Sequence, residues 1–221
     1  MSKGAQKKVR ISREQRAHDY LLTLGHLTVR FAEVERAPRY PSGRRETDVE
    51  HSFHLSLSAV ELASDIHPEL DIGLVAQFSL VHDLPEVYAG DVWTFDISPE
   101  DRAKKEANEH KATQRLLKEL PPHTAQLLER YEKQKEPEAR FVRFVDKLLP
   151  AVINTMAGDA NTFKEDYNLS SIEELLVSRE RHGRGLLEMF PEFDTLHIIK
   201  DLLFDSSAAY IYSGKNYTPK K

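Results

Sequence analysis

Cysteine is absent from this chain of 221 residues, and its absence excludes several kinds of site. Without cysteine there can be no disulfide framework, no thiolate metal ligand and no cysteine nucleophile, so any bound metal needs nitrogen and oxygen ligands. No run of residues approaches the roughly 18 consecutive apolar residues of a membrane-spanning helix. The basic, polar start of the chain has no apolar stretch behind it, so we do not expect a secretory signal. These features predict a cytoplasmic protein with no membrane partner.

Glycine is also scarce, with 9 residues, and the alternation of β-branched and polar residues that marks strands is nearly missing. The formal net charge is −5 and there is no large basic block, which argues against a nucleic-acid partner. Hydrophobic residues make up 40% of the chain, which is ordinary for a globular protein and enough for one full core.

Helical periodicity, by contrast, recurs from end to end. A capping box at Ser12 begins the first expected helix, and two prolines and a glycine predict a loop over Pro38–Thr47. Asp48 is then expected to cap the second helix. The later helices are expected over about 71–83, 98–120, 124–133, 172–189 and 192–210. A short helix followed by a turn is expected within 86–94, and a further helix is expected after Pro137, with a buried side that reaches Val152. The pattern predicts an all-α fold with a single domain over 1–221. Its core would span about 14–160, followed by C-terminal helices over about 171–210 and a frayed basic tail.

Four residues in this helical frame have the chemistry of metal ligands. His51 lies at the start of one expected helix, His82 and Asp83 at the end of the next, and Asp146 inside a later one. Two imidazole nitrogens and two carboxylate oxygens suit a divalent first-row metal, and a helical bundle builds such a site from facing helices. Asp146 is the most informative, because it lies in the apolar run FVRFVDKLL (141–149), where an uncompensated carboxylate would be costly.

Each residue also has a purely structural interpretation. A His-Asp dipeptide alone is a weak motif, and His51 could be an ordinary first-turn residue. Asp146 could pair with Arg143, and Glu86 could lie on a helix surface. The combined pattern favours a site, because the spacing and the helical setting agree at all three places.

Three short motifs resemble the HD superfamily of metal-dependent phosphohydrolases, in the version found in its 5'-deoxynucleotidase branch. The run VHDLPEVYAGDV (81–92) resembles the signature HD-x-x-E-x-x-x-G-D. Upstream, DVEHS (48–52) resembles the element V-x-E-H-S, and downstream VDKL (145–148) resembles the element that supplies the last aspartate. The resemblance covers about 38–155 in the family order.

The resemblance implies a compact HD-type helical bundle with a metal site in its core. One divalent ion per site (Co, Mn, Fe, Zn or Mg) would be bound by His51, His82, Asp83 and Asp146. Glu86 would act as a general acid or orient the attacking water. Asp91, with Val92, Trp93 and Thr94, would contact the sugar.

The resemblance also implies an arginine that binds the phosphate. The triplet Arg39-Tyr40-Pro41 resembles an Arg-Trp-Pro element whose arginine orients the phosphate. Tyr40 replaces the tryptophan and the stretch up to the first histidine is shortened, so Arg44 and Arg45 are alternatives. Trp93 stands where the nucleotidases commonly have proline, which leaves the nucleoside preference open.

The predicted function is metal-dependent hydrolysis of (deoxy)nucleoside 5'-monophosphates, with a small-molecule nucleotide as substrate. One alternative keeps the site but changes the substrate to a dNTP, as in a triphosphohydrolase, or to another phosphorylated metabolite. A second alternative is a non-catalytic module that senses a nucleotide or a metal. The family resemblance also implies a homodimer, which the apolar residues of the last two expected helices would allow.

Overall fold

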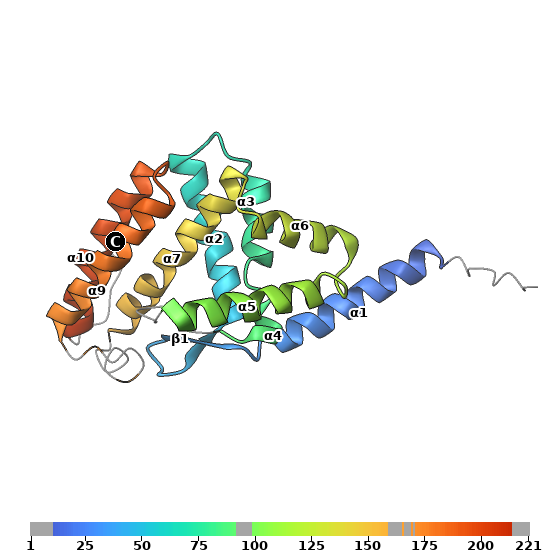
Figure 1. Cartoon of the computed structure of the whole chain (residues 1–221), viewed down its shortest axis with the longest axis horizontal. Helices are drawn as coiled ribbons and strands as arrows, with labels where there is room; N and C mark the ends of the chain where they lie inside the picture. The colour runs from blue at the N-terminus through green and yellow to red at the C-terminus, as the bar shows by residue number, and fades with distance from the viewer. Residues whose placement is uncertain (1–10, 92–98, 159–164, 166–168, 170, 214–221) are drawn as a thin grey trace, which may run out of the picture.

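The computed structural model describes residues 11–91, 99–158, 165, 169 and 171–213, and helices make up most of this part of the chain (Figure 1). Helix α7 is central and contacts α2, α3 and α10, while α3 also contacts α6, and α4 contacts α5 and α1. The elements are α1 (Arg13–Phe31), β1 (Glu35–Arg39), β2 (Arg45–Thr47), α2 (Asp48–Ile66), α3 (Ile72–Val81), α4 (Glu86–Ala89), α5 (Pro99–Leu116), α6 (Pro122–Glu132), α7 (Pro137–Ala157), α9 (Ile172–Met189) and α10 (Asp194–Ser213). The predicted all-α class is confirmed, with one small addition.

That addition is an antiparallel hairpin of β1 and β2, where the sequence predicts a loop. The loop prediction is wrong at both ends of Pro38–Thr47, because the chain is extended and paired up to Arg39 and again from Arg45. The proline at 38 is compatible with a strand here because the sheet has only two strands, and a proline is tolerated at a sheet edge. Gly43 adopts a φ of +83° in the connecting turn.

Side chains in the hairpin alternate between the interior and the surface. Arg36 and Pro38 are buried in β1 and Glu46 is buried in β2, whereas Arg39 lies on the other face of its strand. This period of two is what an extended chain imposes. The hairpin therefore directs one arginine and one glutamate into the protein, towards the start of α2.

Helix α2 begins one residue earlier than predicted. Thr47, not Asp48, is the N-cap, and its hydroxyl accepts a hydrogen bond from the Glu50 amide. The Glu50 carboxylate accepts one from the Thr47 amide in return, which completes a capping box. This box anchors the first turn of α2, which carries His51.

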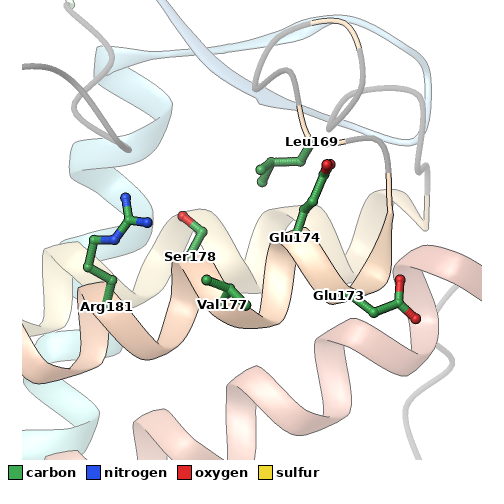
Figure 2. A pocket seen from close by; sticks show the side chains of 6 residues that line it. All are labelled: Leu169, Glu173, Glu174, Val177, Ser178 and Arg181. Atoms are coloured by element: carbon green, nitrogen blue, oxygen red, sulfur yellow. The ribbon is translucent and has the colours of Figure 1, made fainter.

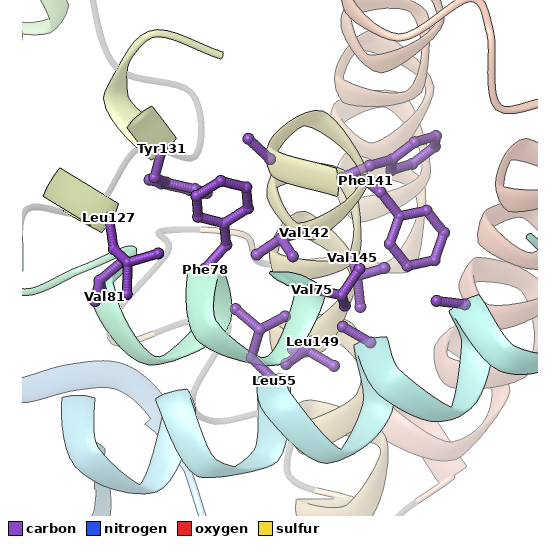
Figure 3. Packing of buried hydrophobic residues seen from close by; sticks show 14 of the residues in the cluster. Leu55, Val75, Phe78, Val81, Leu127, Tyr131, Phe141, Val142, Val145 and Leu149 are labelled. Atoms are coloured by element: carbon purple, nitrogen blue, oxygen red, sulfur yellow. The ribbon is translucent and has the colours of Figure 1, made fainter. Parts of the chain in front are cut away.

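The hydrophobic core joins α2, α3, α6 and α7, as Figure 3 shows. Leu55 lies one turn after His51, and Phe78 lies one turn before His82. In α7, Val142 and Val145 are buried, and Val142 lies one turn before Asp146. Burial of each such side chain stabilises the fold by roughly 1.5–3 kcal/mol. Packing of these apolar turns thus determines where the neighbouring polar side chains lie.

The C-terminal helices cover the other side of α7. Phe144 of α7 stacks on Phe190 at a centroid distance of 5.4 Å, and Phe193 and Leu196 join the same core. His197 donates from Nε2 to the Phe190 carbonyl oxygen at 2.9 Å and thereby ties α10 to the end of α9. Among the described helices, none is both long and apolar enough to cross a membrane.

Candidate metal centre

The four predicted ligands converge in the interior from three helices. His51 lies in the first turn of α2, His82 is the C-cap of α3 with Asp83 directly after it, and Asp146 lies in the middle of α7. One ligand atom from each side chain can be chosen so that all four atoms lie within 4.8 Å of one another. His51, His82 and Asp146 are buried, and Asp83 is half-buried.

The distances pair each histidine with one carboxylate. His51 Nε2 is 3.0 Å from Asp146 Oδ1, and His82 Nε2 is 2.8 Å from Asp83 Oδ2. The crossed distances, His51 to Asp83 and His82 to Asp146, are both 3.9 Å. Both Nε2 atoms therefore face the same small space between the carboxylates.

The outer nitrogen of each imidazole faces a protein acceptor. His82 Nδ1 lies 2.8 Å from the Ser79 carbonyl oxygen, which can only accept, so Nδ1 is the donor in this contact and Nε2 is the nitrogen that faces the cluster. His51 Nδ1 lies 3.5 Å from the Glu46 carboxylate. Among the described residues, the buried His82 Nε2 has no partner in good hydrogen-bond geometry. Outer acceptors that orient imidazoles in this way are typical of metal-binding histidines, so the donor set fits a divalent ion.

Burial and neighbouring charges shift the pKa values of three of the four predicted ligands. Burial opposes the charged imidazolium, yet the nearby Asp146 and Glu46 carboxylates raise the pKa of His51 to about 9. Burial likewise opposes ionisation of Asp146, but the Lys147 ammonium and His51 hold the pKa of that carboxyl well below its usual range. The neighbouring His82 lowers the pKa of Asp83 against the same effect of burial. The protonated His51 would have to lose its proton before it could bind a metal.

Arg36, which the sequence analysis missed, lies beside this cluster. Its Nη1 donates to Asp83 Oδ2 at 2.8 Å and to Asp48 Oδ1 at 3.1 Å. Its Nε is 3.6 Å from the Glu46 carboxylate, and the residue is only 8% exposed. In a strand that begins at Glu35, the alternation of side chains would place Arg36 on the inward face. The prolines and the glycine nearby indicate a loop instead, so the sequence gives no such signal.

Glu86 and Asp91 adjoin the cluster on the α4 side. Glu86 is buried, and burial together with the negative charges of Asp83 and Asp91 raises its pKa well above the usual value of a carboxyl group. Asp91 is half-buried and follows Gly90, which ends α4 with a φ of +72°. A buried carboxyl group with a raised pKa can hold a proton near neutral pH, as a general acid must.

Lys147 is a second residue that the sequence analysis did not assign. Its Nζ donates to Asp146 Oδ2 at 2.8 Å, while Oδ1 of the same carboxylate faces the histidines. The side chain is 35% exposed, so it lies between the buried cluster and the solvent. An ammonium here can attract an anionic substrate towards the cluster.

The arginines that the sequence analysis singled out have other partners. Arg39 donates from Nη1 to the Gly43 carbonyl oxygen at 3.3 Å, and Arg45 donates to backbone carbonyls of β1. Arg44 binds the Glu50 carboxylate through two hydrogen bonds of 2.9 and 2.8 Å. Its guanidinium also lies 4.8 Å from the ring centroid of the half-buried Tyr40, whose pKa burial raises to about 12. The structure thus brings Arg36, rather than these arginines, into contact with Asp83, and the predicted sugar-contacting residues Val92, Trp93 and Thr94 lie outside the described residues.

A separate cavity of about 400 Å³ lies along α9. Figure 2 shows the side chains that line it, which are Leu169, Glu173, Glu174, Val177, Ser178 and Arg181. It includes none of the predicted ligands, so the chemistry of the protein is expected at the His-Asp cluster.

Known proteins resemble this chain in sequence and in fold. A human and a bovine protein, both named 5'-deoxynucleotidase HDDC2, are 28% and 30% identical to it over 122 residues. Each alignment covers 52% of this chain and 58% of the relative, so little more than half the length of these curated relatives is matched.

A crystal structure from Magnetospirillum magnetotacticum MS-1, described as that of a predicted metal-dependent phosphohydrolase, has a similar fold. The TM-score is 0.68 at 24% identity, and the superposition covers 92% of this chain and 98% of the other. The family model described as HD domain matches residues 30–182, which is well over half of the sequence and includes all four predicted ligands. The chain therefore belongs to the HD-domain family.

Proposed function

We propose that the protein is a metal-dependent phosphohydrolase that hydrolyses (deoxy)nucleoside 5'-monophosphates to nucleoside and phosphate. The observation that carries the proposal is the convergence of His51, His82, Asp83 and Asp146 within 4.8 Å, beside a buried carboxyl group with a raised pKa. Similarity to the two 5'-deoxynucleotidases supports the nucleotide monophosphate as substrate.

The four predicted ligands, Glu86 and Lys147 have different roles in the proposed reaction. A divalent ion at the four ligands would supply a water of lowered pKa and would polarise a phosphoryl oxygen. Hydrolysis breaks the bond between phosphorus and the 5' oxygen, and Glu86 is placed to donate its proton to this leaving oxygen. Lys147, at the solvent side of Asp146, contributes positive charge where the phosphate enters.

Asp91 is proposed to contact the sugar. It is half-buried, follows the turn at Gly90 and lies close enough to Glu86 for its charge to raise the pKa of that residue. A carboxylate in this place can accept a hydrogen bond from a sugar hydroxyl.

Release of inorganic phosphate by the purified protein tests the proposal. The protein would be loaded in turn with Mn²⁺, Co²⁺, Fe²⁺, Zn²⁺ and Mg²⁺, and assayed against deoxy- and ribonucleoside monophosphates, dNTPs and phosphorylated sugars. Phosphate release from dNMPs is the expected result. Tripolyphosphate from dNTPs would establish the triphosphohydrolase instead, and stoichiometric metal with no hydrolysis of any compound would establish a sensing module.

A further inference from the structure

A second group of carboxylates lies against the first and shares one residue with it. Asp48, Asp83 and Glu86 each offer an oxygen atom, and the three oxygens lie within 4.8 Å of one another. Asp48 and Glu86 are buried, and each has one oxygen without a hydrogen-bond partner among the described residues. A carboxylate shared between two adjoining ligand sets is what a hydrolase with two metal ions would need. By ligand type alone, this protein could hold two ions.

The guanidinium of Arg36 occupies the middle of the second group. Its Nη1 is 2.8 Å from Asp83 Oδ2, 3.1 Å from Asp48 Oδ1 and 3.7 Å from Glu86 Oε2. One nitrogen atom thus approaches an oxygen of all three carboxylates, as a metal ion would.

The hairpin keeps this guanidinium in place. Arg36 is on the inward face of β1, and its Nε lies 3.6 Å from the Glu46 carboxylate on the inward face of β2. The side chain has little room to leave, because it is buried among acidic partners. Arginine does not lose its proton in proteins, so the positive charge is permanent.

We propose that Arg36 takes the place of a second metal ion, so that the protein binds one divalent ion per chain, at His51, His82, Asp83 and Asp146. The positive charge of Arg36 repels a second divalent ion, and its Nη1 already donates to Asp83 and Asp48, two of the three carboxylates that would bind one. Glu86 is thereby left without a metal and free to exchange a proton. The inference depends on the metal site and not on which phosphate ester the protein hydrolyses.

Metal counting on the wild type and two single variants tests this. Each protein is dialysed to equilibrium against Mn²⁺, the bound metal is counted by mass spectrometry, and the electron paramagnetic resonance spectrum is recorded. Arg36→Met removes the charge but keeps an unbranched chain. Arg39→Met is the matched control, because it removes an arginine from the other face of the same strand. The wild type and Arg39→Met are expected to bind one isolated Mn²⁺, and Arg36→Met two Mn²⁺ ions with the spectrum of a spin-coupled pair.

Two ions in the wild type, or one ion in a folded Arg36→Met variant, would overturn the proposal. If Arg36→Met does not fold, the double variant Arg36→Met/Glu46→Gln replaces it. That variant removes one positive and one negative charge together and leaves Asp48, Asp83 and Glu86 intact, so it is also expected to bind two ions, and a count of one overturns the proposal. No nucleotide is used in these measurements, so failure of the proposed substrate class would leave their outcome unchanged.

Discussion

Glu86→Gln removes the proton that this side chain is proposed to deliver and changes little else around it. Burial and the charges of Asp83 and Asp91 raise the pKa of Glu86, so the wild-type side chain is held towards its neutral form. An amide of the same size is also neutral, so the variant is expected to fold and to retain its metal. Loss of a general acid costs roughly 10²–10⁴-fold in rate, which corresponds to about 3–5 kcal/mol of barrier. We expect a decrease of this size in kcat, with KM changed only a few-fold.

The assay is steady-state phosphate release from a dNMP, combined with a metal count on the same sample. The pH profile gives an independent readout. An acid works while it is protonated, so the wild-type rate should fall as pH rises through the raised pKa of Glu86, and this decline should be absent in Glu86→Gln. Less than a tenfold loss of kcat with metal retained would refute the acid role. Loss of the metal would show that Glu86 is a ligand. It would also contradict the proposal that Arg36 takes the place of a metal ion beside Glu86.

The other predictions concern the metal, its pH dependence, the fold and the assembly. Asp146→Ala should weaken Mn²⁺ binding by at least about 100-fold in calorimetry while the helical circular dichroism is kept; unchanged binding would exclude it as a ligand. Because the pKa of His51 is about 9 in the metal-free protein, Mn²⁺ must displace a proton below that pH, so affinity should rise about tenfold per unit from pH 6.5 to 8.5. A flat profile in titrations at three pH values would mean that His51 does not bind the metal in exchange for a proton. Thr47→Ala should lower the free energy of unfolding by about 1 kcal/mol and the melting temperature by roughly 2–4 °C, with Thr47→Ser close to the wild type. We expect a homodimer in sedimentation velocity, with Ile198 and Leu202 of α10, which are 62% and 66% exposed, in the interface. A double variant with aspartate at both positions that still dimerises would exclude this surface.

Much of the helical fold could be predicted because its signals are local. Periodicity and capping residues predicted α3 from Asp71 and α9 to within a residue or two, since those signals lie within a few residues of each helix end. The grouping of the four predicted ligands was also accessible, because the HD motif places them at fixed points on helices whose apolar faces must meet.

What could not be predicted depends on contacts between segments. Arg36 faces inward only because β1 pairs with β2, and a five-residue strand with a proline has no clear signal of its own. Thr47 and Asp48 are both good capping residues, and the extended backbone of β2 decides that Thr47 takes the role. The stacking of Phe144 on Phe190 likewise joins two helices far apart in the chain, which periodicity alone cannot align.

The hairpin has a consequence for how the chain tolerates insertions and deletions. Side chains alternate along a strand, so adding or removing one residue between the start of β1 and Arg36 would exchange the two faces of that strand. Arg36 would then point outward, and the carboxylates that it neutralises would lose their cation. The turn around Gly43 lies outside both strands. Residues added there leave the inward-facing side chains of β1 and β2 as they are. Variation in length among natural or engineered forms of this protein should therefore concentrate at the turn and avoid the five residues of β1.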